Sequence, residues 1–108
     1  MDTDACCPPV TESPEIPTGA AADQTLSRLA KALGHPVRVE IVRFLAGQTS
    51  CFYGDLADRL PRAKSTVSEH LRILREAGLV RGEVDGPRAC YCIDPAGMRQ
   101  LKLLVDAL

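Results

Sequence analysis

The sequence has few aromatic residues and no long apolar run. It contains no tryptophan, two tyrosines and two phenylalanines among 108 residues, so small aliphatic side chains must build its core. The apolar runs span only a few residues, whereas a membrane-crossing helix needs roughly 20. The first residues are acidic and are followed by Pro8-Pro9, unlike the basic start and apolar stretch of a secretory signal. We therefore expect a cytoplasmic protein with no membrane partner.

Signatures of common catalytic sites are also missing. The sequence contains no glycine-rich phosphate loop, no Cys-x-x-Cys before a helix and no convincing acid–base pair. Its five cysteines are an odd number in a chain without an export signal, which argues against a disulfide framework. These absences predict a protein that is not an enzyme, has no organic cofactor and carries its cysteines as free thiols.

Charge is distributed unevenly along the chain. The formal net charge is −1, but residues 1–25 hold five acidic and no basic residues. Between Arg59 and Arg81 the balance reverses, with six basic residues against two acidic ones. A local basic excess of this kind is typical of a surface that binds nucleic acid.

The residue pattern predicts a flexible arm followed by one domain. Residues 1–20 are rich in proline and poor in large apolar side chains, so they form an arm that carries Cys6 and Cys7. Residues 21–108 form the domain, beginning with a helix from its N-cap Asp23 to Leu33. Four more helices are expected, over residues 36–46, 54–60 and 64–77 and in a last segment that starts at Asp94-Pro95.

A β-hairpin is expected between the last two helices. Residues 79–84 and 88–93 alternate in polarity and flank the turn signal Asp85-Gly86-Pro87. Two short helices separated by a tight break and followed by a hairpin are typical of a winged helix-turn-helix, a mainly α fold with a small β-hairpin. The terminal helices are too apolar to be solvated on all sides, which predicts a symmetric dimer.

In this fold, the helix over residues 64–77 would enter the major groove of double-stranded DNA. Val67, Leu71 and Leu74 form its core stripe, while small donors and acceptors stand near its N-terminus. The hairpin could reach phosphates beside the groove. The predicted DNA-contacting residues are Lys64, Ser65, Thr66, Ser68, His70, Arg72, Arg81 and Arg88.

Three segments resemble the ArsR/SmtB family of metal-responsive bacterial repressors. Residues 33–38 read LGHPVR, residues 55–57 read DLA and residues 65–80 read STVSEHLRILREAGLV. The resemblance covers about 80 of the 108 residues, and it departs from the family at Ala63, where a serine is often found. It implies a dimeric winged-helix repressor that leaves its operator when an inducer binds.

The same resemblance implies where an inducer binds. One family site joins cysteines of the N-terminal arm to a cysteine at the start of the third helix of the other subunit, and Cys6, Cys7 and Cys51 occupy those places. Another family site, a zinc site on the terminal helices, needs histidine, which residues 95–108 lack. Trivalent arsenic and antimony are soft and bind three thiolates well. We therefore expect As(III) or Sb(III) to be the inducer.

Alternatives remain open for the thiols and the histidines. Alternation along residues 88–93 places Cys90 and Cys92 on the outward face, and pairing with the segment around Cys51 would form a second set of three, Cys51, Cys90 and Cys92. A repressor of the same fold that responds to thiol oxidation, to persulfide, or to Cd, Pb or Zn is the other hypothesis. His35 is expected to make a local hydrogen bond, and His70 is expected to contact a phosphate or the core, rather than to bind metal.

Overall fold

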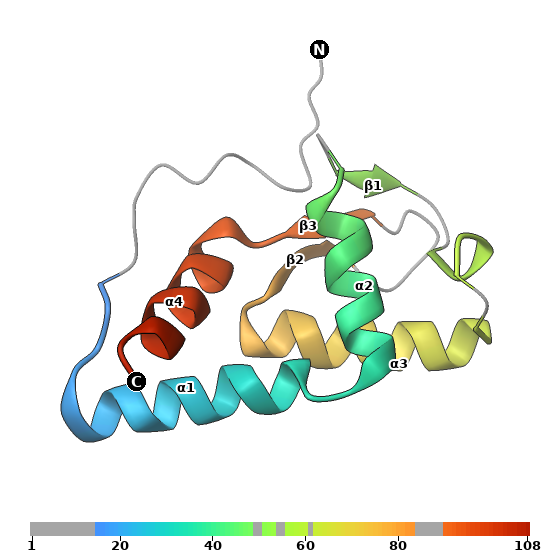
Figure 1. Ribbon diagram of the computed structural model, residues 1–108. Helices are drawn as coiled ribbons and strands as arrows, with labels where there is room; N and C mark the ends of the chain where they lie inside the picture. The colour runs from blue at the N-terminus through green and yellow to red at the C-terminus, as the bar shows by residue number, and fades with distance from the viewer. Residues whose placement is uncertain (1–14, 49–50, 54–55, 61, 84–89) are drawn as a thin grey trace, which may run out of the picture.

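The chain folds into helices arranged around a small sheet (Figure 1). The computed structural model describes residues 15–48, 51–53, 56–60, 62–83 and 90–108. Within these ranges, no helix is both long and apolar enough to span a membrane. The elements in chain order are α1 (Gly19–Leu33), α2 (Pro36–Ala46), β1 (Phe52–Tyr53), the 3₁₀ turn η1 (Leu56–Asp58), α3 (Lys64–Ala77), β2 (Val80–Glu83), β3 (Cys90–Ile93) and α4 (Pro95–Asp106).

Three antiparallel strands form the sheet in the order β1-β3-β2. β2 pairs with β3 from Val80 opposite Ile93 to Glu83 opposite Cys90, which confirms the predicted hairpin strands. The turn predicted at residues 85–87 lies outside the described residues. β1 adds to the other edge of β3, with Tyr53 opposite Cys90. The winged helix-turn-helix prediction is therefore correct.

One apolar core joins all the helices to the sheet. Leu101 and Leu104, each 6% exposed, bring α4 into this core. The largest fully buried side chains include Leu29, Ile41, Leu45, Leu56, Leu74, Leu79 and Tyr91. Tyr91 is the one large aromatic side chain among them, and its hydroxyl accepts a hydrogen bond of 2.9 Å from the amide of Leu56. This bond satisfies both polar groups inside the core and attaches η1 to β3.

Helix ends follow the local chemistry of the sequence. The carboxylate of Asp94 accepts hydrogen bonds from the amides of Ala96 and Gly97, which caps α4 as predicted. His35 caps α2, because its Nδ1 accepts from the amide of Val37 at 3.1 Å. Gly78 ends α3 with a φ of 92°, a left-handed conformation that favours glycine.

Two helix predictions are wrong. α1 begins at Gly19 rather than after Asp23, which lies inside the helix. Residues 20–22 are alanines, the best helix formers, so they extend the helix toward its N-cap Thr18. The helix predicted over residues 54–60 is only the 3₁₀ turn Leu56–Asp58 within the described residues. Leu56 is its sole fully buried residue, and Tyr91 already binds the Leu56 amide.

Candidate functional site

Helix α3 presents the polar face expected of a recognition helix. Val67, Leu71 and Leu74 are buried in the core, as predicted, while Lys64 and Ser65 are exposed. The predicted contact residues Thr66, Ser68 and Arg72 are half-buried. Arg72 donates from Nη1 to the Glu69 carboxylate at 2.9 Å, one helical turn away. The outer face of α3 therefore combines small hydroxyls with fixed charges.

The N-terminus of α3 is suited to an anion. Its N-cap, Ala63, has no side-chain acceptor for the first-turn amides, and the helix still begins at Lys64 as predicted. Amides at a helix N-terminus point outward along the axis and, with the helix dipole, favour phosphate. Lys64 adds a positive charge at this end of the helix.

The DNA contacts predicted for the wing, the hairpin formed by β2 and β3, lie only partly within the described residues. Arg81 lies on β2, opposite Cys92, and its side chain is half-buried. Arg88 and the turn at Gly86-Pro87 lie outside the described residues. The structure thus places one of the two wing arginines on the sheet.

His70 faces the α1–α2 connection rather than the outer stripe of α3. Its ring lies 4.5 Å from the ring of His35, measured between centroids. Its Nδ1 is 3.2 Å from Nη1 of Arg38 at the start of α2. Sequence reasoning expected His70 to contact DNA or core and did not identify these partners. His35 and Arg38 both belong to the motif over residues 33–38, which was the available sequence signal for this cluster. The motif does not show that Arg38 pairs with a residue 32 positions further along the chain.

The surroundings of His70 disfavour its charged form. Burial is the main cause that lowers the pKa of His70, and the charges of His35 and Arg38 lower it further, while Glu69 acts in the opposite direction. Below pH 6.5, the ordinary pKa of histidine, the unfolded chain therefore binds protons at this position more readily than the folded chain.

We expect this difference to make the protein less stable as the pH falls. The contribution of neutral His70 to the free energy of unfolding is complete above about pH 6.5. It is lost as the pH drops from there toward the lowered pKa of His70. Urea unfolding at pH 7.5 and 5.5 would measure it, with His70→Gln as the comparison because glutamine keeps an acceptor for Arg38 without titrating. An equally steep pH dependence in both proteins would contradict the assignment.

Cysteines from separate segments meet on the sheet. The thiol of Cys51, just before β1, lies 3.4 Å from Sγ of Cys92 on β3. Cys90 shares that strand and is only 6% exposed, although it does not belong to the main core cluster. The expected approach of Cys51 to the β3 cysteines is therefore confirmed, whereas the expected outward exposure is wrong for Cys90. Cys6 and Cys7 lie outside the described residues.

The oxidation state of these cysteines differs from the prediction of five free thiols. Cys51 is a free thiol, but Cys90 and Cys92 are disulfide-bonded. Counting cysteines could not reveal this, because bonding depends on which sulfurs the fold brings together. In the described part of the chain, no three histidine, cysteine or acidic side chains form a group that could hold a metal ion. Cys90 and Cys92 would need to be reduced before they could bind one.

Comparisons with known proteins agree with the α3 geometry. A model described as "Helix-turn-helix domain" matches residues 33–83. An uncharacterised HTH-type transcriptional regulator of Methanocaldococcus jannaschii is 33% identical over 82 residues, which cover 76% of this chain and 92% of that protein. The HTH-type transcriptional repressor SmtB of Mycobacterium tuberculosis is 41% identical over 63 residues, which cover 58% of this chain and 46% of the repressor.

A solved structure extends the similarity to three dimensions. It is described as "Possible transcriptional regulator for arsenical resistance", is 36% identical and superposes with a TM-score of 0.62. The match covers 74% of this chain and 81% of that one. Sequence, fold and the polar face of α3 thus agree, and the chain belongs to the HTH-type transcriptional regulators, a class of DNA-binding proteins that are not enzymes.

Proposed function

We propose that this protein is a transcriptional repressor that leaves its operator when As(III) or Sb(III) binds three of its cysteine thiolates. The contact between Cys51 and Cys92 carries the proposal, because it brings two soft ligands from distant parts of the sequence together. Two sulfurs bound to one tetrahedral zinc ion are about 3.8 Å apart. The observed 3.4 Å is somewhat shorter than this separation, so one soft ion could bridge both sulfurs after a small adjustment, once the disulfide of Cys92 is reduced.

Cys51 belongs to both possible ligand sets. In the first set, Cys6 and Cys7 join Cys51, and in the second set Cys90 and Cys92 join it. The 3.4 Å contact supports the second set, while the family resemblance supports the first. Cys51 is a free thiol, so it can bind a metalloid without prior reduction. The arsenical-resistance description of the similar solved structure supports a metalloid inducer.

Operator binding is assigned to α3 and the wing. Lys64, Ser65, Thr66, Ser68 and Arg72 would enter the major groove, with Arg81 and Arg88 on flanking phosphates. His70 would act indirectly, since it contacts Arg38 and His35. Two such helices in a dimer would read half-sites about 34 Å apart, one turn of the double helix.

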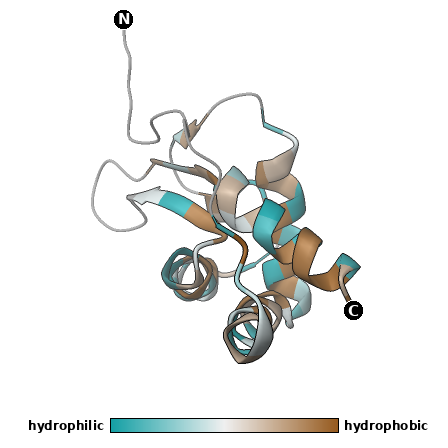
Figure 2. Cartoon of the chain, turned by 90° about the vertical axis from the view of Figure 1, so that its left-hand side faces the viewer, coloured by the Kyte–Doolittle hydropathy of each residue, from teal (hydrophilic) through white to brown (hydrophobic). Residues whose placement is uncertain are grey.

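The exposed side of α4 supports a dimer. Leu103, Val105 and Leu108 are 38%, 49% and 90% exposed, and Figure 2 shows hydrophobic residues gathered toward the C-terminal end of this helix. Leaving these side chains in water is unfavourable, and a second copy of the chain would cover them by symmetry. Inducer then acts by binding more tightly to a dimer geometry that no longer fits two successive major grooves.

A change at Lys64 tests the DNA-binding face. Lys64→Ala should weaken binding to operator and to unrelated DNA by similar factors, because a phosphate contact is independent of sequence. The slope of log affinity against log salt should fall by about 0.9 for each Lys64, or about 1.8 for the dimer. Fluorescence anisotropy with labelled duplexes would measure both effects. Lys102→Ala on exposed α4 is the matched control, and an equal loss in both variants would contradict the assignment.

The disulfide-bonded cysteines favour a second candidate function, a repressor controlled by thiol oxidation. The free thiol of Cys51 lies beside the disulfide-bonded sulfur of Cys92, and loss of its proton would make it the attacking group. Attack would form a Cys51–Cys92 bond and break the existing disulfide of Cys92, whose other sulfur leaves as a thiolate and takes up a proton. This exchange consumes no oxidant, although forming the first disulfide from thiols requires one.

A titration distinguishes the two functions. Reduced protein bound to operator would be titrated with arsenite and, separately, with hydrogen peroxide. Release by arsenite at concentrations near that of the protein supports the metalloid function. Release by peroxide alone supports the redox function, and binding that persists in both titrations contradicts both.

A further inference from the structure

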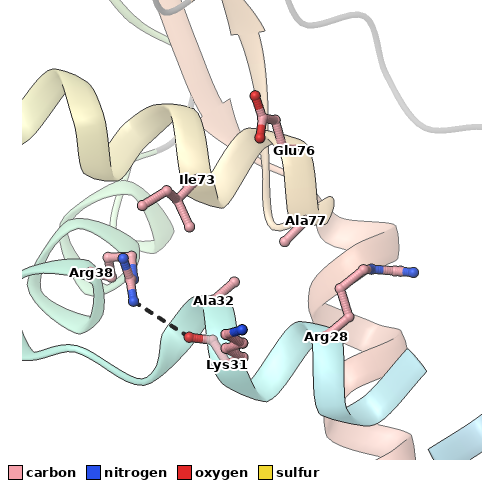
Figure 3. A pocket seen from close by; sticks show the side chains of 7 residues that line it. All are labelled: Arg28, Lys31, Ala32, Arg38, Ile73, Glu76 and Ala77. Atoms are coloured by element: carbon pink, nitrogen blue, oxygen red, sulfur yellow. Dashed lines mark hydrogen bonds between the residues drawn. The ribbon is translucent and has the colours of Figure 1, made fainter. Parts of the chain in front are cut away.

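A pocket of about 450 Å³ lies where α1, α2 and α3 meet (Figure 3). It is separate from the cysteines, and neither the DNA contacts nor the thiol chemistry accounts for it. Its volume falls in the range that binds small organic molecules. The residues that line it are Arg28, Lys31, Ala32, Arg38, Ile73, Glu76 and Ala77.

The lining has an apolar part and a basic part. Ala32, Ile73 and Ala77 supply aliphatic surface from α1 and α3. Three basic side chains, those of Arg28, Lys31 and Arg38, stand against the single carboxylate of Glu76. The excess of positive charge beside an aliphatic wall is complementary to an anionic group on a compact apolar body.

Arg38 lacks an acceptor for one of its donors. Its Nη1 contacts Nδ1 of His70 at 3.2 Å, and its Nη2 donates weakly to the carbonyl of Lys31 at 3.5 Å. Its Nε is buried and has no hydrogen-bond partner. Buried donors in native proteins are nearly always paired, and an unpaired one on a cation is costly. Because Nε is closed to solvent, an anionic ligand in the pocket would meet the Arg38 guanidinium through its Nη atoms instead.

We propose that this pocket binds a small organic monocarboxylate and that its occupancy alters operator affinity. Ile73, Glu76 and Ala77 belong to the recognition helix α3, and Arg38 contacts the same helix through His70. A ligand held among these residues therefore interacts directly with the element that reads DNA. Because coupling between two sites is reciprocal, operator DNA must change the carboxylate affinity by the same factor.

Benzoate is a suitable probe, with uncharged benzamide as its matched control. Because benzoate has only nine heavy atoms, it should bind with a Kd in the low millimolar range. NMR titration of the full chain at constant ionic strength should show saturable shifts of the backbone amides of residues 28–38 and 73–77. Benzamide should bind at least 10-fold more weakly. Shifts that do not saturate, or equal shifts with both compounds, would overturn the site.

Charge-removing variants test the basic rim without disturbing the core. Arg28 and Lys31 are exposed, so the double change Arg28→Ala and Lys31→Ala should leave the fold intact. It should weaken benzoate binding at least 10-fold, whereas Arg43→Ala, an exposed base of α2 that does not line the pocket, should not. Equal losses in the two proteins would contradict the proposal.

Operator affinity provides the readout for regulation. Saturating benzoate, matched in ionic strength with chloride, should change wild-type operator affinity at least threefold and leave the double variant unaffected. The cysteines take no part in this test, so the outcome is independent of the arsenite response. Unchanged affinity in wild type would refute the regulatory role of the pocket.

Discussion

Replacing Cys51 with serine is expected to leave operator binding intact and to abolish release by arsenite. Cys51 belongs to both candidate ligand sets, and its sulfur lies 3.4 Å from that of Cys92. A serine hydroxyl is a poor ligand for a soft metalloid. Loss of a residue that only supports a ligand costs about 10- to 100-fold in metal affinity, so loss of a ligand itself should raise the arsenite concentration for half-release at least 100-fold. Anisotropy of labelled operator DNA measures both properties.

Serine variants of other cysteines identify the remaining ligands. If Cys6 and Cys7 complete the site, Cys6→Ser should abolish release and Cys90→Ser should not. If Cys90 and Cys92 complete it, the pattern reverses. A Cys51→Ser protein that still responds fully to arsenite would defeat both assignments, because no ligand set proposed for this chain omits that thiol.

The positions of the cysteines allow the redox alternative to be examined in the same protein. Trypsin should release Cys6 and Cys7 on residues 1–28, Cys51 on residues 44–59, and Cys90 with Cys92 on residues 89–99. Every disulfide between these segments therefore gives a distinct cross-linked mass. Thiol–disulfide exchange at Cys92 predicts a cross-link between residues 44–59 and 89–99 in oxidised protein, and this cross-link should be absent from Cys51→Ser.

Periodic patterns made much of the fold predictable. The apolar spacing of Val67, Leu71 and Leu74 predicted α3 with its observed bounds, because burial of one helix face repeats every three to four residues. Segments without such a repeat were predicted less well. Leu56 is buried alone in η1, where a hydrogen bond to a tyrosine 35 residues away sets the local backbone. A contact over that distance leaves no mark on the local sequence.

The same distinction applies to the candidate sites. The expected pairing of the segment around Cys51 with the second hairpin strand predicted that Cys51 approaches the β3 cysteines, since paired strands bring their residues together. The Arg38–His70 contact and the pocket beside it depend on how three helices pack, which the pattern of any one helix does not specify. Composition also failed to predict the disulfide bonds of Cys90 and Cys92, which depend on distances between sulfurs rather than on their number.

Gly97→Ala is expected to have the largest effect on stability. Gly97 lies in the first turn of α4, where a Cβ atom would fall on the carbonyl oxygen of Gly78, well inside contact distance, and 2.8 Å from its carbonyl carbon. Both are backbone atoms, so no side chain can rotate to make room. Relief requires α4 to move away from the connection between α3 and β2. That movement would also strain the hydrogen bond from the Gly97 amide to Asp94.

Overpacking of a well-packed site typically costs 1–3 kcal/mol and sometimes more, so the free energy of unfolding should fall by at least about 3 kcal/mol in Gly97→Ala. Urea unfolding followed by circular dichroism measures this loss. Gly47→Ala is the matched control, because Gly47 has a φ of −84° and its added Cβ would approach no atom closer than 3.5 Å. That variant should differ from wild type by less than about 1 kcal/mol. Similar stability in the two variants would contradict the close packing of α4 against the backbone of Gly78.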